Sequence, residues 1–309
     1  MTAQRVRLGK TALEVSPVCC GTWQASPVWG TTPDADLVAS MRRAYEVGIN
    51  FFDTAPTYGD GRAEQLLGTA LADLPRSELV ICTKCYCMLR PDGKRVFDLS
   101  RESILRQCDA SLGRLKTDYI DLYLLHAFDP KADPAEATAA MEALKTAGKI
   151  LAYGVSNYTV EQLRMALALG NYSALQPAYN LINTAAENDL LPLAMSAGLG
   201  VFVYSALAKG LLSGKYRGDE TFNDSRKNSP LFQGERFRTM CEKVRSLQPI
   251  ATKYAMTIPQ LILAATLIHP GIHCVITGSK RPEQIEETAG AMGRRIELED
   301  CEDIRNALL

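Results

Sequence analysis

The sequence has little of what marks several large protein classes. Its 309 residues carry 34 Lys and Arg against 35 Asp and Glu, a net charge of −1, so no charge excess points to nucleic acid or to an anionic membrane. Its longest apolar runs, such as residues 261–268, fall far short of the roughly 20 residues that a transmembrane helix needs. The N-terminal segment contains no apolar signal core. We therefore expect a soluble, cytoplasmic protein without a nucleic-acid or membrane partner.

Disulfide, metal and dinucleotide patterns are missing as well. Nine cysteines, an odd number in a long chain, argue against a disulfide framework and for reduced thiols. Cys82, Cys85 and Cys87 lie close together, but no His or Cys pair with zinc spacing follows them. We interpret them as packing residues and expect no metal. Two Gly-x-Gly segments, 59–64 and 198–203, lack the third glycine of a Rossmann fingerprint.

What the sequence does contain is a regular alternation. Short runs rich in Val, Ile, Phe and Tyr are each followed by a longer stretch with helical periodicity. Strands mostly spaced by roughly 35 residues, with no break in composition, predict an α/β fold of the (β/α)8 TIM-barrel type, as one domain over residues 1–309. A doubly wound sheet is the alternative. The expected strands are 17–22, 49–54, 79–84, 120–126, 151–156, 174–179, 200–205 and 273–278.

Two segments stand outside this repeat. Residues 5–15 predict a small N-terminal β-hairpin that turns at Gly9 and Lys10 and closes the bottom of the barrel. The longest gap, between strands seven and eight, holds the polar segment 216–237 and a helical stretch from about Glu235 to Tyr254. We expect this long loop and helix insertion on the functional face. Helix ends are marked by candidate N-caps at Asp34, Ser100 and Asp133 and by candidate left-handed glycines at Gly48, Gly113, Gly148 and Gly198.

Polar residues stand at the ends of several predicted strands, where barrel enzymes place their chemistry. Asp53 ends strand two, Lys84 ends strand three and His126 ends strand four. Each alone has an ordinary explanation, as a helix cap, a solvent-reaching amine or a hydrogen-bonded core imidazole. Because all three side chains aim at one axis, and because an isolated buried charge is costly, we predict that Asp53 and Lys84 form a pair.

Tyr58 lies on the loop after strand two, close to this predicted pair. A free tyrosine has a pKa of about 10, and a nearby ammonium lowers it. We expect Asp53 to hold Lys84, Lys84 to acidify Tyr58, and Tyr58 to give a proton to a developing alkoxide. His126 could donate a further hydrogen bond to the same oxygen.

These residues and the segments around them resemble the aldo-keto reductase family, in the family's order and over nearly the whole chain. The matching segments are 7–23, 48–71, 117–130, 152–163, 175–180, 203–216 and 276–287. The resemblance implies a catalytic tetrad of Asp53, Tyr58, Lys84 and His126, of which Asp53 also contacts the cofactor. The resemblance also implies contacts with the nicotinamide half of the cofactor: Ser156, Asn157 and Gln176 at the amide, Tyr204 on the ring, and Gly21 and Thr22 alongside. At the pyrophosphate it implies Ser205, Leu207 and Gly210. At the adenosine end it implies Gly278, Ser279, Lys280, Gln284 and Glu287, with Arg281 as an addition.

The adenosine end bears on cofactor choice. The Ser279 hydroxyl, the adjacent cations Lys280 and Arg281, and the N–H groups of a helix N-terminus make a ready anion site. We therefore predict that NADP(H) is preferred, with NAD(H) possible. Thr277 and Thr288 stand where the family often has proline and asparagine, which weakens the individual contacts assigned at this end.

The predicted function is NADPH-dependent, reversible reduction of an aldehyde or ketone to an alcohol. Beside Tyr58 and His126, the expected walls of a small or medium substrate pocket are Trp23, Trp29, Tyr86 and Phe128. The substrate, the direction of the reaction and the oligomeric state stay open.

Two alternatives are kept beside this function. One is a cofactor-binding partner subunit that resembles potassium-channel β subunits. The other is a barrel aldolase that uses Lys84 as a Schiff-base nucleophile, although pairing with Asp53 would keep that lysine charged.

Overall fold

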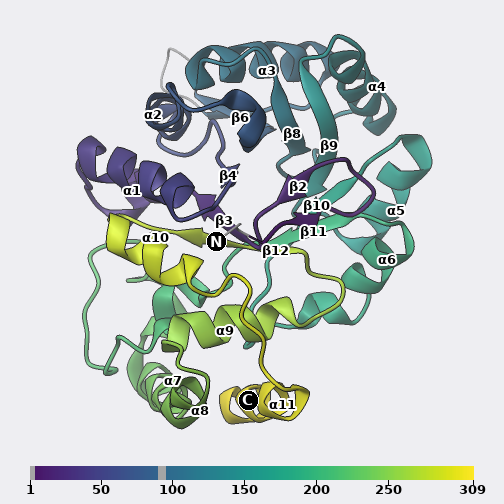
Figure 1. Ribbon diagram of the computed structural model, residues 1–309. Coiled ribbons are helices and arrows are strands. Elements are labelled where there is room, and N and C mark those ends of the chain that lie inside the picture. The colour runs from purple at the N-terminus through teal and green to yellow at the C-terminus, as the bar shows by residue number, and fades with distance from the viewer. Residues whose placement is uncertain (1–3, 90–94) are drawn as a thin grey trace.

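Eight parallel strands close into a barrel in the computed structural model, which describes residues 4–89 and 95–309 (Figure 1). This confirms the predicted (β/α)8 architecture, and each predicted strand is present, with its ends displaced by a few residues at most. The strands in order around the barrel are β3 (Val18–Gly21), β4 (Phe51–Asp53), β5 (Val80–Cys85), β8 (Ile120–Leu125), β9 (Ile150–Ser156), β10 (Ala174–Gln176), β11 (Gly200–Val203) and β12 (Cys274–Gly278).

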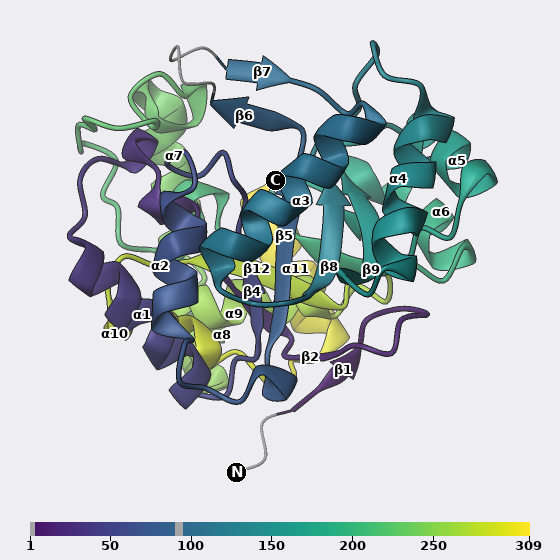
Figure 2. The same ribbon diagram turned by 90° about the horizontal axis from the view of Figure 1, so that it is seen from above.

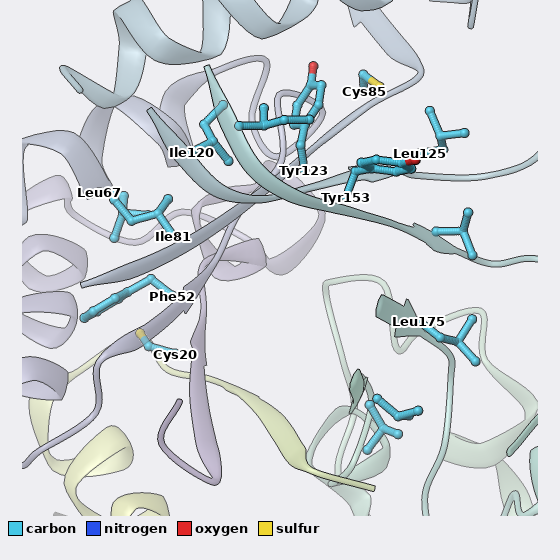
Figure 3. Close-up of a cluster of buried hydrophobic side chains, with 14 of the residues drawn as sticks. Cys20, Phe52, Leu67, Ile81, Cys85, Ile120, Tyr123, Leu125, Tyr153 and Leu175 are labelled. Carbon is cyan, nitrogen blue, oxygen red and sulfur yellow. The ribbon is translucent and has the colours of Figure 1, made fainter. Parts of the chain in front are cut away.

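Helices form the outer ring of the barrel. Their apolar faces pack on the strands, as Leu67 of α2 does beside Phe52 and Ile81 in the layer shown in Figure 3. Within the described residues, no single helix is long and apolar enough to cross a membrane, although one bent pair, 234–253 with 258–267, meets that test of length and composition together. The helices are α1 (Asp34–Glu46), α2 (Arg62–Ala70), α3 (Arg101–Leu115), α4 (Pro134–Thr146), α5 (Val160–Leu169), α6 (Leu190–Ser196), α7 (Gly234–Arg245), α8 (Gln248–Lys253), α9 (Ile258–Leu267), α10 (Pro282–Ala289) and α11 (Leu298–Leu308).

The predicted helix ends are partly right. Ser100 and Asp133 are N-caps whose side chains accept backbone N–H bonds, and Gly48, Gly148 and Gly198 have positive φ. Asp34 is wrong as an N-cap because the carbonyl of Pro33 already accepts from Leu37 N, so the helix starts one residue earlier. The prediction of a left-handed helix end at Gly113 is also wrong. Gly113 lies inside α3, and Lys116 takes the left-handed conformation at the end of the helix.

The segment between β11 and β12 is the predicted insertion. It includes α7 and α8 and contributes most of a second apolar cluster, which residues of α11 complete. Tyr216, Phe222, Phe232 and Phe237 pack edge to face or tilted within it, with the Phe222 and Phe232 ring centroids 5.1 Å apart. These aromatic contacts pack the insertion against itself.

A hairpin closes the other end of the barrel, as predicted. Strands β1 (Val6–Arg7) and β2 (Glu14–Val15) pair antiparallel and lie opposite the hairpin of β6 (Cys87–Leu89) and β7 (Arg95–Phe97) (Figure 2). Leu8 and Val15 are fully buried among the inward-facing residues of the barrel, including Phe51 and Phe202. Gly200 makes room for the hairpin, since a Cβ there would lie 2.4 Å from Leu8 Cγ.

The Leu8 side chain should therefore contribute strongly to stability. We expect Leu8→Ala to lower the free energy of unfolding by about 2–5 kcal/mol, because the barrel strands cannot collapse into the space left behind. Urea unfolding measures this, with Leu298→Ala as the control, since Leu298 is 70% exposed and should change stability by less than about 0.5 kcal/mol. Equal effects of the two variants would show that the hairpin does not seal the core.

Candidate active site

A cavity of about 500 Å³ opens at the carboxyl ends of the strands. Most of the residues expected at a site line it, although they come from segments far apart in the sequence. Those residues are Gly21, Trp23, Trp29, Asp53, Tyr58, His126, Asn157, Gln176, Tyr204, Ser205, Leu207, Gly210, Gly278, Lys280, Gln284 and Glu287.

Four further expected residues lie behind this lining. Lys84 is completely buried beneath Tyr58, and Thr22 and Ser156 are buried beside residues that face the cavity. The Ser279 hydroxyl is buried against α1, where its oxygen lies 2.6 Å from Ser40 Oγ.

The remaining three expected residues are not brought to the cavity lining. Arg281 is the N-cap residue of α10 and is exposed. The Tyr86 ring packs on Phe97, with centroids 5.2 Å apart. Phe128 packs on Tyr158 in a separate small recess. Of the four aromatic residues expected to form the walls of the substrate pocket, Trp23 and Trp29 line the cavity, and Tyr86 and Phe128 do not.

Asp53 and Lys84 form the predicted pair. Lys84 Nζ donates to Asp53 Oδ1 at 2.7 Å and to the Thr54 carbonyl at 2.8 Å, and it lies 3.5 Å from the Tyr58 hydroxyl. A fully buried ammonium requires such partners, because an unpaired charge there would cost several kcal/mol. Asp53 ends β4 and Lys84 lies near the end of β5, so neighbouring parallel strands bring them together.

The pKa values of these groups differ in part from expectation. Burial raises the pKa of Tyr58 to about 12, and the opposing attraction of Lys84 does not overcome it. The expectation that Lys84 brings this phenol below its ordinary pKa is therefore wrong. Burial lowers the pKa of Lys84, but the Asp53 carboxylate and the neighbouring Tyr58 and Cys82 together outweigh it and the net pKa is raised, so the amine stays charged. Burial, and then the Lys84 charge, hold the pKa of His126 well below its ordinary value, so the imidazole is neutral at pH 7.

A hydrogen-bonded chain runs from the tetrad along the cavity wall. Gln176 Nε2 donates to Asp53 Oδ1 at 2.7 Å, and the Ser156 hydroxyl donates to the Gln176 carbonyl at 2.9 Å. Asn157 Nδ2 donates to Ser156 Oγ at 3.1 Å, and the Tyr204 hydroxyl donates to Asn157 Oδ1 at 2.6 Å. The wall is thus held in one arrangement before any ligand arrives.

The cavity lining carries positive charge beyond the predicted Lys280. Lys209, Lys215 and Arg226 line the cavity as well, and Lys215 lies close enough to Arg226 and Lys280 for their charges to lower its pKa. Arg226 is held by Asp224, with Nε to Oδ1 at 2.9 Å. The basic residues in the segment after strand seven could have indicated these contacts. The sequence analysis predicted that this segment lies on the functional face, but it named no contacts in it. Several cations lining a cavity suit a ligand with phosphate groups.

Two buried polar atoms of the lining lack a partner. The side-chain Gln24 Oε1 and Trp29 Nε1 atoms have no hydrogen bond, and both residues line the cavity. A buried polar group without a partner costs about 1–3 kcal/mol, so a ligand that supplies one is favoured. Gln24, which the sequence analysis did not assign, has no pattern that would have marked it. These atoms and the nearby cations fit an extended, phosphate-bearing nucleotide cofactor.

The fold and site define a barrel enzyme whose reacting groups lie at the carboxyl ends of the strands. The chain belongs to the aldo/keto reductase family, whose model matches residues 17–308. Family membership confirms the resemblance seen in the sequence and supports an oxidoreductase.

This chain is similar to proteins that are named for several different roles. It is 35% identical to the NADH-specific methylglyoxal reductase of Escherichia coli, over 97% of this chain and 96% of that protein. It is 32% identical to a probable voltage-gated potassium channel subunit beta of Oryza sativa, over 94% of this chain and 91% of that protein. The solved structure of a glycerol dehydrogenase from Gluconobacter oxydans has a TM-score of 0.91 at 29% identity, over 100% of this chain and 96% of that one.

Proposed function

We propose that the protein is an NADPH-dependent carbonyl reductase that converts an aldehyde or ketone to an alcohol, reversibly. The observation that carries this proposal is the Tyr58 hydroxyl, which faces the cavity 3.5 Å from a fully buried, charged Lys84. A nicotinamide cofactor, when bound, supplies the hydride in such chemistry. The test is a panel of small carbonyl substrates, with NADPH oxidation as the readout. No turnover of any of them would overturn the proposal.

The chain's own residues supply the proton and orient the substrate. Tyr58, protonated throughout the neutral range, is the general acid. Lys84, fixed by Asp53, stabilises negative charge that develops on the phenol oxygen as the proton leaves. The neutral His126 imidazole lies beside Tyr58, with ring centroids 6.0 Å apart, and donates an N–H to the carbonyl oxygen.

The cofactor would lie across the cavity from the hydrogen-bonded wall to the cationic residues of the lining. Asn157, Gln176 and Tyr204 would hold its nicotinamide, and Lys215 and Lys280 its phosphates. These cationic residues support a preference for NADPH, which carries an additional phosphate. Because a relative is named as NADH-specific, affinities for both cofactors are compared.

Lys280 provides that measurement. We expect Lys280→Ala to weaken NADPH binding by about tenfold, as expected for loss of one charge-assisted contact, and to leave NADH binding nearly unchanged. Arg281→Ala is the matched control, because the adjacent Arg281 does not line the cavity. Fluorescence titrations of both cofactors give the affinities. A wild-type protein that prefers NADH, or equal losses for both cofactors, would refute the assignment.

A partner-subunit function is the second candidate, supported by the similarity to potassium channel β subunits. Such a protein would bind cofactor and co-purify with a stable partner. An intact tetrad does not exclude that role, so co-purification and the turnover panel are both needed. A Schiff-base aldolase has less support, because the Asp53 carboxylate keeps Lys84 charged and without a free electron pair.

A further inference from the structure

Gln176 makes a contact that binding of a cofactor amide does not explain. It ends β10, and Asp53 ends β4, which lies four strands away in either direction around the barrel. The hydrogen bond from Gln176 Nε2 to Asp53 Oδ1, 2.7 Å long, therefore reaches across the barrel to the opposite wall. Only 2% of Gln176 is exposed, so water does not compete for this bond.

The contact is made to the atom that holds Lys84. Lys84 Nζ and Gln176 Nε2 both donate to Asp53 Oδ1, each at 2.7 Å. An ionised carboxylate only accepts hydrogen bonds, so the Gln176 amide must turn its NH2 group toward Asp53. Its Oε1 then faces the Ser156 hydroxyl, 3.4 Å away, whose single hydrogen is donated to the backbone carbonyl of Gln176 at 2.9 Å. The bond to Asp53 therefore sets the orientation of the amide.

From this geometry we propose that Gln176 is a positioning residue of the proton-donating unit, which holds Asp53 from the opposite wall so that Lys84 stays beneath Tyr58. The inference rests on the proposed reductase function. Without the Gln176 donor, the Asp53 carboxylate can rotate, and Lys84 loses the fixed anchor that places it 3.5 Å from the Tyr58 hydroxyl.

Two substitutions at position 176 separate this role from others. Gln176→Met keeps the size of the side chain and removes the donor at every pH. Gln176→Glu has a donor only while the new carboxyl is protonated, when it can share its proton with Asp53. We expect Gln176→Met to lower turnover at saturating cofactor by about tenfold or more, independently of pH. We expect Gln176→Glu to turn over faster than the methionine variant at pH 5 and to fall to its level as pH rises.

A thermal measurement tests the contact itself without any turnover. The glutamate carboxyl would have its pKa raised in the folded protein by the adjacent Asp53, so stability relative to wild type is lost as pH rises above the unfolded value of about 4.3. The melting temperature of Gln176→Glu should therefore drop below that of Gln176→Met as pH rises from 5 to 9. Melting temperatures that move in parallel would refute the contact.

Asn157→Ala is the control for cofactor binding, since Asn157 lines the same wall, makes no hydrogen bond to Asp53, and meets the tetrad at the backbone carbonyl of His126. It should weaken cofactor affinity and introduce no new pH dependence. If the Gln176 variants lose only cofactor affinity and recover full turnover at saturation, Gln176 does not position the tetrad. If wild type itself turns over no carbonyl, the proposed function fails, and the thermal comparison can still refute the Asp53 contact.

Discussion

Tyr58→Phe is expected to reduce turnover of carbonyl substrates by 100-fold or more, the usual effect of losing a general acid. The substitution removes one hydroxyl and keeps the ring, which packs beside Trp23 and His126 with centroids 6.4 and 6.0 Å away. Cofactor affinity and the melting temperature should therefore change little. Steady-state kinetics, a fluorescence titration and a thermal scan on the same preparation provide the comparison. Turnover near the wild-type rate would exclude Tyr58 as the acid.

The pH dependence of the same pair of proteins gives a second, independent signature. With its pKa raised to about 12 by burial, Tyr58 stays protonated between pH 6 and 9, so the availability of its proton for reduction does not change in that range. Alcohol oxidation needs the phenolate. While the pH is below the pKa of Tyr58, the phenolate fraction rises tenfold for each unit by which the pH increases. Wild-type oxidation should rise accordingly, and Tyr58→Phe should lose that rise.

The fold was predictable because its signals are local and repeated. Apolar runs predict the strands and amphipathic stretches predict the helices. This alternation continues along the chain as far as β12. The tetrad was predictable for a related reason, since Asp53, Lys84 and His126 lie at or next to the carboxyl ends of successive strands, which converge in a closed barrel.

The cofactor end was less predictable because side-chain direction in loops carries no period. Ser279, Lys280 and Arg281 are consecutive, yet Ser279 turns to Ser40 on α1, Lys280 reaches the carbonyl of Trp29, and Arg281 is exposed. Nothing in their order indicates which of them meets the cavity.

The direction of the pKa shift of Tyr58 could not be predicted from the sequence either. Proximity to Lys84 could be inferred from strand order, but the depth of burial that opposes it depends on the packed surroundings. Trp23 and His126 lie beside the ring, and burial in these surroundings raises the pKa more than Lys84 lowers it.

Asp53 and Lys84 should behave as one unit when both are replaced. Lys84→Met leaves Asp53 as a buried carboxylate without its cation, and Asp53→Asn leaves Lys84 as a fully buried ammonium without its anion. Each single change should destabilise the protein by about 3–5 kcal/mol, the usual effect of breaking a buried pair. The double variant should lose less stability than the two single variants lose together, because neither charge remains.

Turnover should follow the same rule, because either single change removes the charge arrangement beneath Tyr58. The double variant should be little slower than Lys84→Met alone. A double-mutant cycle, with urea unfolding and steady-state rates measured on all four proteins, gives both coupling values. The pair Glu102 and Arg106, whose side chains are 91% and 56% exposed, is the control and should show much weaker coupling in stability and none in rate. Losses that add in both stability and log rate would show that Asp53 and Lys84 act separately, and that the lysine beneath Tyr58 does not depend on the carboxylate that holds it.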